Sequence, residues 1–219
     1  TDVRWAPSWD YFTHVFLPLI HKLGVRVETQ LHARGYYPAG GGDATMTIHP
    51  FEKLHPFQVV DPQSFTEMHG IINIANLPEH ISIRMKHAAV KTALKHNLQA
   101  FVKVEQSPSA SSGTGIVVWS ETEETVLGAN VLGEKGVSAE QIGEDAAAQL
   151  AQEILSGATV DRYAIDQMLP YLVVAPRGSA CLVRELSNHT NTHMWLLKQF
   201  FPVTFEVTQQ QHSTRIAVR

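Results

Sequence analysis

The sequence has little cysteine, no long apolar run and no large excess of charge of one sign. The single cysteine, Cys181, excludes a disulfide framework within the chain and suits a reducing compartment, so a cytoplasmic location is expected. No apolar run approaches the roughly 18 residues that cross a bilayer, and no secretory signal is visible, so we expect no membrane partner. The chain does not begin with methionine, which predicts a processed chain or a fragment.

Charge and composition describe an ordinary globular protein. Hydrophobic residues make up 44% and charged residues 17% of the 219 residues, which argues against disorder. The net charge of −4 argues against a broad non-specific nucleic-acid surface. It leaves room for an enzyme that holds only one terminal nucleotide. The twelve histidines are scattered, so composition predicts no metal site.

Apolar residues follow helical spacing in some segments and strand alternation in others, which predicts a mixed α/β (α+β) fold. Helices are expected over residues 9–22, 79–95, 138–155, 161–174 and 189–201. Strands are expected over residues 25–34, 44–49, 67–74, 99–104, 116–119, 125–132, 180–184, 203–207 and 214–218, with a loop at 107–115. The order of elements between 65 and 158 suggests a smaller inserted α/β domain, flanked by residues 1–64 and 159–219 of a main domain.

The segment 34–42, Arg-Gly-Tyr-Tyr-Pro-Ala-Gly-Gly-Gly, is the first notable motif. Consecutive glycines permit positive φ and close backbone approach, as a tight turn or an anion-binding loop requires. A hairpin connection is favoured over a phosphate contact because no helix start follows. A P-loop is excluded, since its lysine and hydroxyl are missing.

The second motif is Ser-Asn-His-Thr-Asn-Thr-His at 187–193, at the start of an apolar helix. Ser187 or Asn188 can cap this helix, which places His189 in the first turn. The positive end of the helix dipole disfavours protonation of that histidine and attracts phosphate, two needs of a nucleophile that attacks a nucleoside triphosphate. His189 and His193 also have metal-ligand spacing, but the glutamate of H-E-x-x-H is absent. A surface or capping role is the other alternative.

The third motif lies in the predicted helix 161–174. Tyr163, Asp166 and Gln167 share one helical face opposite apolar positions, so that a phenol, a carboxylate and an amide stand together. Such a face could bind a base or ribose, or orient a histidine, and it is also typical of a solvated surface.

Two weaker features have simple structural explanations. Residues 133–136, Gly-Glu-Lys-Gly, suit a phosphate loop or a connection to the helix that Ser138 caps. The basic helix 79–95 suits an RNA-facing surface or, more simply, a solvated face; its cations are Arg84, Lys86, Lys91 and Lys95.

Five segments, taken in their order along the chain, resemble the RNA 3'-terminal phosphate cyclase family. They are RGYYPAGGG, GEKGVSAE, D-x-Y-x-x-D-Q, H-T-x-T and an FFPV strand start. The opening, with Thr1-Asp2, Trp5-Ala6-Pro7 and Tyr11, also resembles it, so the likeness covers essentially the whole chain.

The resemblance implies an ATP-dependent enzyme that converts an RNA 3'-phosphate end into a 2',3'-cyclic phosphate. A histidine attacks the α-phosphate of ATP with a divalent metal, Mg²⁺ or Mn²⁺, and AMP then passes to the RNA. His189 falls on the nucleophile position, Tyr163, Asp166 and Gln167 on the nucleotide pocket, and Ala6-Pro7 near a segment that flanks adenine. The implied fold repeats units like the C-terminal domain of translation initiation factor three.

The chain departs from the family pattern in three places. Family members are longer by roughly one N-terminal domain, which carries residues that bind phosphate and metal, so this chain is expected to be an incomplete catalyst. His193 stands where many relatives have Asn. Asn130 stands where an aromatic residue can stack on adenine.

Two rival functions follow from the same residues. One is a non-catalytic cyclase-like scaffold in RNA or ribosome assembly, against which the retained His189 argues. The other is a transferase on a related repeat fold, such as an enolpyruvyl transferase, which would form no covalent nucleotide.

Overall fold

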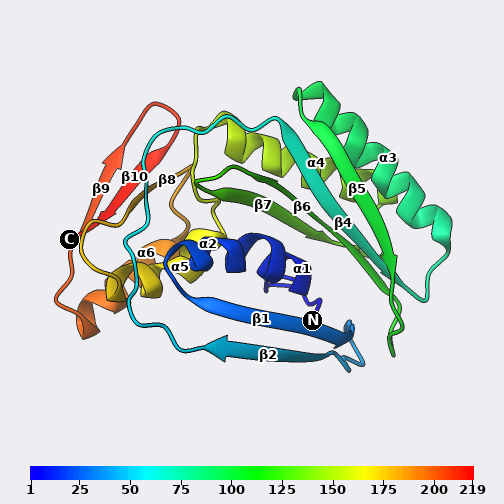
Figure 1. Ribbon diagram of the computed structural model, residues 1–219. Coiled ribbons are helices and arrows are strands. Elements are labelled where there is room, and N and C mark those ends of the chain that lie inside the picture. The colour runs from blue at the N-terminus through cyan, green and yellow to red at the C-terminus, as the bar shows by residue number, and fades with distance from the viewer.

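The computed structural model in Figure 1 describes all residues from 1 to 219. The chain mixes helices and strands, as the α+β prediction requires. The helical segments are α1 (Trp9–Tyr11), η1 (Phe12–Phe16), α2 (Leu17–Lys22), α3 (Glu79–Lys95), α4 (Ala139–Leu155), α5 (Ala164–Val174) and α6 (Asn188–Phe200). The strands are β1 (Arg26–Ala33), β2 (Asp43–His49), β3 (Gln58–Val59), β4 (Glu67–Ala75), β5 (Gln99–Gln106), β6 (Gly113–Glu121), β7 (Val126–Leu132), β8 (Ala180–Val183), β9 (Phe205–Gln209) and β10 (Thr214–Val218).

The strands form three sheets. Strands β1 and β2 make an antiparallel hairpin, as the glycine-rich segment between them predicted. A second sheet has the order β3-β8-β10-β9, and a third has the order β5-β4-β6-β7. In the third sheet β4 pairs parallel to β5 and antiparallel to β6, so both larger sheets are mixed.

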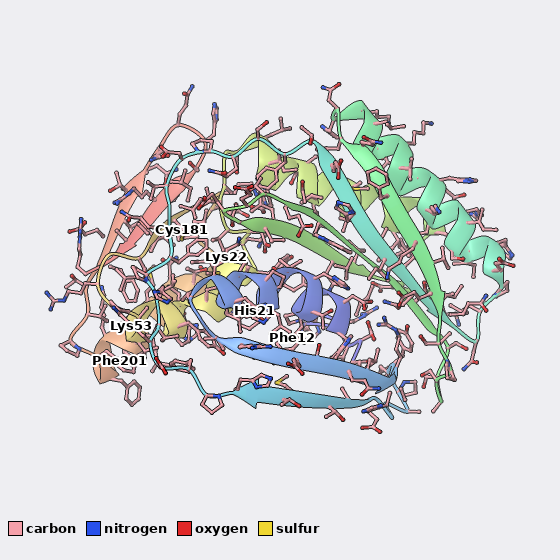
Figure 2. All side chains as sticks on the ribbon, in the orientation of Figure 1. Phe12, His21, Lys22, Lys53, Cys181 and Phe201 are labelled. Carbon is pink, nitrogen blue, oxygen red and sulfur yellow. The ribbon has the colours of Figure 1, made fainter.

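Two hydrophobic cores lie on different sides of the third sheet. One core lies between that sheet and the pair α3 and α4, which cover one of its faces (Figure 1). The other core joins the N-terminal helical run and α5 to the sheet that contains β8. Cys181 lies fully buried in this larger core, whereas Phe201 follows α6 at the edge of the molecule (Figure 2).

The expected helix 9–22 is a continuous helical run with a π-helical middle. The Leu17 N–H donates to the Phe12 carbonyl, five residues back, and Pro18 follows directly. Proline has no N–H to continue the i→i−4 pattern, and a π-turn is one way in which a helix accommodates such a break. The helix itself was predicted correctly, but its local geometry was not.

Several elements differ from the prediction, among them β9, which runs Phe205–Gln209 instead of 203–207. Strand β6 begins at Gly113 because residues 113–115, expected in a loop, pair with β4, and Gly115 also pairs with β7. Strand β3 was not expected, since two residues give no detectable alternation. Helix α5 begins at Ala164, not at 161.

A buried polar network links the N-terminal segment to the third sheet. The Arg34 guanidinium is 2% exposed and donates to Asp10 at 2.7 Å and to Asp2 at 3.3 Å. Asn73 on β4 donates to Asp10 at 3.0 Å and accepts from the Tyr36 hydroxyl at 2.6 Å. Arg34 and Tyr36 of the glycine-rich motif therefore have a structural role that the sequence did not reveal.

None of the helices combines the length and the apolar character that a membrane span requires.

Candidate active site

His189 occupies the second position of helix α6. Ser187 is the N-cap, and its Oγ accepts from the Thr190 N–H at 3.0 Å. The N–H groups of Asn188 and His189 come before the first intrahelical bond, so they remain free to bind a ligand. The His189 side chain is exposed. The predicted position in the first turn is confirmed.

Asp166 on α5 holds the start of α6 in place. Its carboxylate accepts hydrogen bonds from the hydroxyl groups of Ser187, at 3.3 Å, and of Thr190. These two residues stand on either side of the Asn188-His189 pair. Asp166 therefore fixes the turn that carries His189, and it does so without contacting the imidazole itself.

His193 makes a second link between α5 and α6 by binding a main-chain carbonyl that a proline leaves without a helical donor. In α5, Pro170 has no N–H to donate to the carbonyl of Asp166, four residues earlier. The His193 Nδ1 lies 2.9 Å from that carbonyl oxygen. Because a carbonyl only accepts, Nδ1 carries the hydrogen. The main chain and the carboxylate of Asp166 thus both bind the α6 helix.

Tyr163 and Gln167 lie at the start of α5, about one turn from each other. Tyr163 is the N-cap residue of the helix, not part of its interior, and its side chain is 44% exposed. The Gln167 amide donates to the Tyr163 carbonyl at 3.3 Å. The structure thus brings Tyr163, Asp166 and Gln167 to the N-terminal half of α5, with Asp166 turned toward α6.

Asp161 organises this region, although it was predicted only as the first residue of the helix 161–174. Its carboxylate accepts from the N–H groups of Tyr163 and Ala164 at 3.0 Å each, which caps α5. It also accepts from the Tyr11 hydroxyl at 2.5 Å and from the Gly128 N–H at 3.0 Å. Asp before a helix start is a capping signal that was available in the sequence.

Burial dominates the electrostatics around Asp161. Desolvation raises the pKa of Asp161, and its hydrogen bonds, led by that from Tyr11, act in the opposite direction. Desolvation, reinforced by the Asp161 charge, raises the pKa of Tyr11 well above its usual range. At neutral pH Tyr11 is therefore a hydrogen-bond donor to the carboxylate.

Ala6 and Pro7 lie on an exposed loop just before Ser8, which caps α1. Tyr11 connects this loop to the α5 start through its bond to Asp161. No hydrogen bond joins Ala6 or Pro7 to α5 or α6. Their place beside a nucleotide remains a prediction.

The weaker motifs have structural explanations. Residues 133–137 form a turn before Ser138, whose Oγ caps α4 by accepting from the Gln141 N–H at 3.2 Å. Arg84 forms a two-point ion pair with Glu140 at 2.6 and 2.7 Å, so it is not a free cation on α3. No group of three or more His, Cys, Asp or Glu side chains is arranged to hold a metal ion.

Comparison with known proteins identifies the family. A sequence model described as RNA 3'-terminal phosphate cyclase matches residues 1–207. The chain belongs to the RNA 3'-terminal phosphate cyclase family. An RNA 3'-terminal phosphate cyclase of Nitrosospira multiformis is 39% identical over 100% of this chain and 63% of its own length. One from Thermococcus onnurineus is 38% identical over 94% of this chain and 61% of its own length.

The cyclases matched here are longer than the chain. A third, from Methanosarcina barkeri, is 33% identical and is also covered over 63% of its length. The chain thus spans somewhat less than two thirds of the relatives it matches, and the structure described above corresponds to that share of a cyclase.

Proposed function

We propose that this chain supplies the nucleophile and part of the nucleotide pocket of an ATP-dependent RNA 3'-terminal phosphate cyclase. In the first step a ring nitrogen of His189 attacks the α-phosphorus of ATP, an N–P bond forms, and the bond to pyrophosphate breaks. In the second step an oxygen of the RNA 3'-phosphate displaces histidine and carries away AMP. In the third step the 2'-hydroxyl loses its proton and attacks the 3'-phosphorus, which releases AMP and closes the ring.

The observation that carries the proposal is the position of His189. Its exposed imidazole lies at the N-terminus of a 13-residue helix, next to two main-chain N–H groups without helical partners. The unpaired N–H groups and the positive end of the helix dipole favour an incoming phosphate beside the imidazole. A histidine that attacks a nucleoside triphosphate needs the phosphate held next to it in this way.

Asp166 supports the proposal as a positioning residue. Its bonds to Ser187 and Thr190 hold the backbone on both sides of the nucleophile, and its carbonyl is bound by His193. A fixed helix start lowers the entropy cost of aligning the imidazole with an α-phosphate.

The adenosine part of ATP would be bound by Tyr163 and Gln167 at the start of α5 and by the Ala6-Pro7 loop. Tyr163 is 44% exposed and offers an aromatic face, and Gln167 offers an amide. The Tyr11–Asp161 bond supports this grouping, since it ties the two segments to each other.

The divalent metal expected from the resemblance has no cluster of protein ligands in this chain. Mg²⁺ commonly uses only one or two carboxylates together with substrate phosphates. The residues present therefore do not make up a metal site of their own, and we assign no step of the reaction to one. RNA recognition and the complete cyclisation belong, in this proposal, to a protein of the relatives' full length.

Covalent labelling tests the proposal. The chain is incubated with α-labelled ATP and Mg²⁺ or Mn²⁺, and acid-labile, alkali-stable label on the protein is measured. We expect label that is lost in His189→Ala and kept in His212→Ala, a matched change at an exposed histidine of the β9–β10 turn. If a full-length cyclase that contains this chain is labelled and the chain alone is not, labelling also requires residues from the rest of the protein. No label on either favours the scaffold function instead.

A further inference from the structure

A cavity of about 240 Å³ has Tyr163 among its lining residues, and no residue of α6 lines it. Its walls come from α4, from β7, from the segment before α5 and from the residue after β8. Six of its eight lining residues are not hydrophobic, among them Glu153, Arg162 and Arg184. The adenylyl transfer proposed above assigns no role to these three side chains.

Two guanidinium groups in the wall converge on a single oxygen. Arg162 Nη1 and Arg184 Nη2 lie 3.0 and 3.3 Å from the same atom, Oε1 of Glu185. The Glu185 side chain is 53% exposed and does not line the cavity. The molecule thus already holds one carboxylate oxygen between these guanidiniums, on a side chain that is about half exposed.

The cavity also contains polar atoms that no protein group satisfies. The Nε of Arg162 is buried and donates to no acceptor, and Oε2 of Glu153 is buried without a partner. The Glu153 side chain is only 5% exposed, and its other oxygen accepts from Arg184 Nε at 3.1 Å. Unsatisfied buried groups of this kind usually have a bound water, ion or ligand as partner.

The protonation of Glu153 suits an anionic ligand. Burial and the charge of Asp161 raise the pKa of Glu153 to about 7, against the opposing effect of Arg184 and Arg162. Near neutral pH a large fraction of the Glu153 side chains therefore carries a proton. A protonated Oε2 donates a hydrogen bond, and so becomes a partner for an oxyanion instead of repelling it.

We propose that this cavity binds a phosphoryl oxyanion, which displaces Glu185 from Arg162 and Arg184. A tetrahedral phosphate has enough oxygens to accept from both guanidiniums and from Glu153 at once, and arginine forks match phosphate geometry. The group could come from free phosphate or from the backbone of an RNA strand. No residue of α6 lines the cavity, although Tyr163 also belongs to the proposed nucleotide pocket, and the inference does not rest on adenylyl transfer.

Binding of inorganic phosphate to the full chain, measured by calorimetry near neutral pH, tests the site. Arg162→Gln removes one guanidinium and is expected to weaken binding about tenfold, the usual effect of a lost charged hydrogen bond. Glu185→Ala removes the competing carboxylate and is expected to tighten binding about threefold, since exposed ion pairs are weak. Arg177→Gln and Glu124→Ala make the same charge changes at exposed positions outside the cavity, and are expected to have no effect.

The same titration with short oligoribonucleotides distinguishes the sources of the phosphate. Binding of both 3'-phosphorylated and 3'-hydroxyl strands, weakened by Arg162→Gln, indicates backbone phosphate. Binding of inorganic phosphate alone indicates a free anion. Covalent labelling of His189 is a separate measurement, so failure of the adenylyl-transfer proposal does not affect this test.

Two results would overturn the inference. One is an affinity for phosphate that is equal in the native chain, Arg162→Gln and Glu185→Ala. The other is no binding at millimolar phosphate even in Glu185→Ala, whose exposed substitution leaves the fold intact. If Arg162→Gln does not fold, the comparison of Glu185→Ala with Glu124→Ala decides the question alone.

Discussion

The Nδ1 atom of His193 lies 2.9 Å from the main-chain oxygen of Asp166, the carbonyl that Pro170 leaves without a helical donor. The hydrogen bond that α5 lacks thus leaves an acceptor for a donor on α6. His193 supplies that donor, and the helix that carries His189 is bound to α5 at two places.

Removing this donor should destabilise the chain. We expect His193→Leu to lower the free energy of unfolding by about 1 kcal/mol, as for a typical lost hydrogen bond. His193→Asn should lose less, because its side-chain amide can also donate to the carbonyl. Urea unfolding of both variants, with His212→Leu as the control, measures the difference. Equal stability of His193→Leu and the native chain would refute this role of the bond.

The N-cap of α6 offers a second test. Ser187→Ala should lower stability by about 1 kcal/mol, the usual cost of a lost N-cap, and should lower covalent labelling of His189. Ser187→Asn keeps a capping oxygen and should recover most of both. Ser187→Asp also caps, but it adds a charge next to Asp166 and should recover less. If labelling changes with none of these substitutions, the Ser187 cap does not position His189 for reaction.

The buried bond between Tyr11 and Asp161 should be among the most sensitive in the chain. Tyr11→Phe removes the donor at 2.5 Å and leaves a buried carboxylate with one partner fewer, so we expect a loss of about 1–3 kcal/mol. Thermal and urea unfolding measure it. Tyr37→Phe is the matched control because Tyr37 is 81% exposed. A loss no larger than that of the control would show that other donors compensate.

Stability should depend on the ionisation of Glu153. Its pKa is raised from 4.5 to about 7 in the folded protein, so the folded state holds this proton more tightly than the unfolded state. Stability from this group is therefore greatest below about pH 4.5 and falls as the pH rises toward 7.

Glu153→Gln should remove this dependence. We expect the variant to be more stable than the native chain at pH 8, by about 1–3 kcal/mol, and nearly equal to it at low pH. Urea unfolding at several pH values measures the difference, with Glu123→Gln as an exposed control. A difference that is the same at every pH would show that Glu153 does not titrate in this range.

The sequence predicted most elements and the position of His189, because these depend on local patterns. Apolar spacing marked the long helices α3 and α4, and the Ser-Asn-His order placed His189 in the first turn of α6. The glycine-rich segment predicted the β1–β2 hairpin. The prediction was wrong for residues 113–115, because a Gly-Thr-Gly segment that pairs with a neighbouring strand leaves no signal in side-chain alternation.

The electrostatic partners could not be predicted, because each depends on residues far apart in the chain. Arg34 was expected at the end of a strand, with no partner assigned to it, yet it is buried against Asp2 and Asp10. Arg84 appeared to be a free cation on a basic helix, yet it pairs with Glu140.

By itself the sequence determined the mixed α+β character, the family, and a histidine at a helix start, since periodicity, motif order and capping act over a few residues. Only the tertiary structure decided that Asp166 holds that helix start, that Asp161 joins α5 to Tyr11 and β7, and that two arginines meet beside Glu153. The physical reason is range: a cap or a turn is specified by neighbours in the chain, whereas a buried charge is stabilised by whichever donors the fold brings to it.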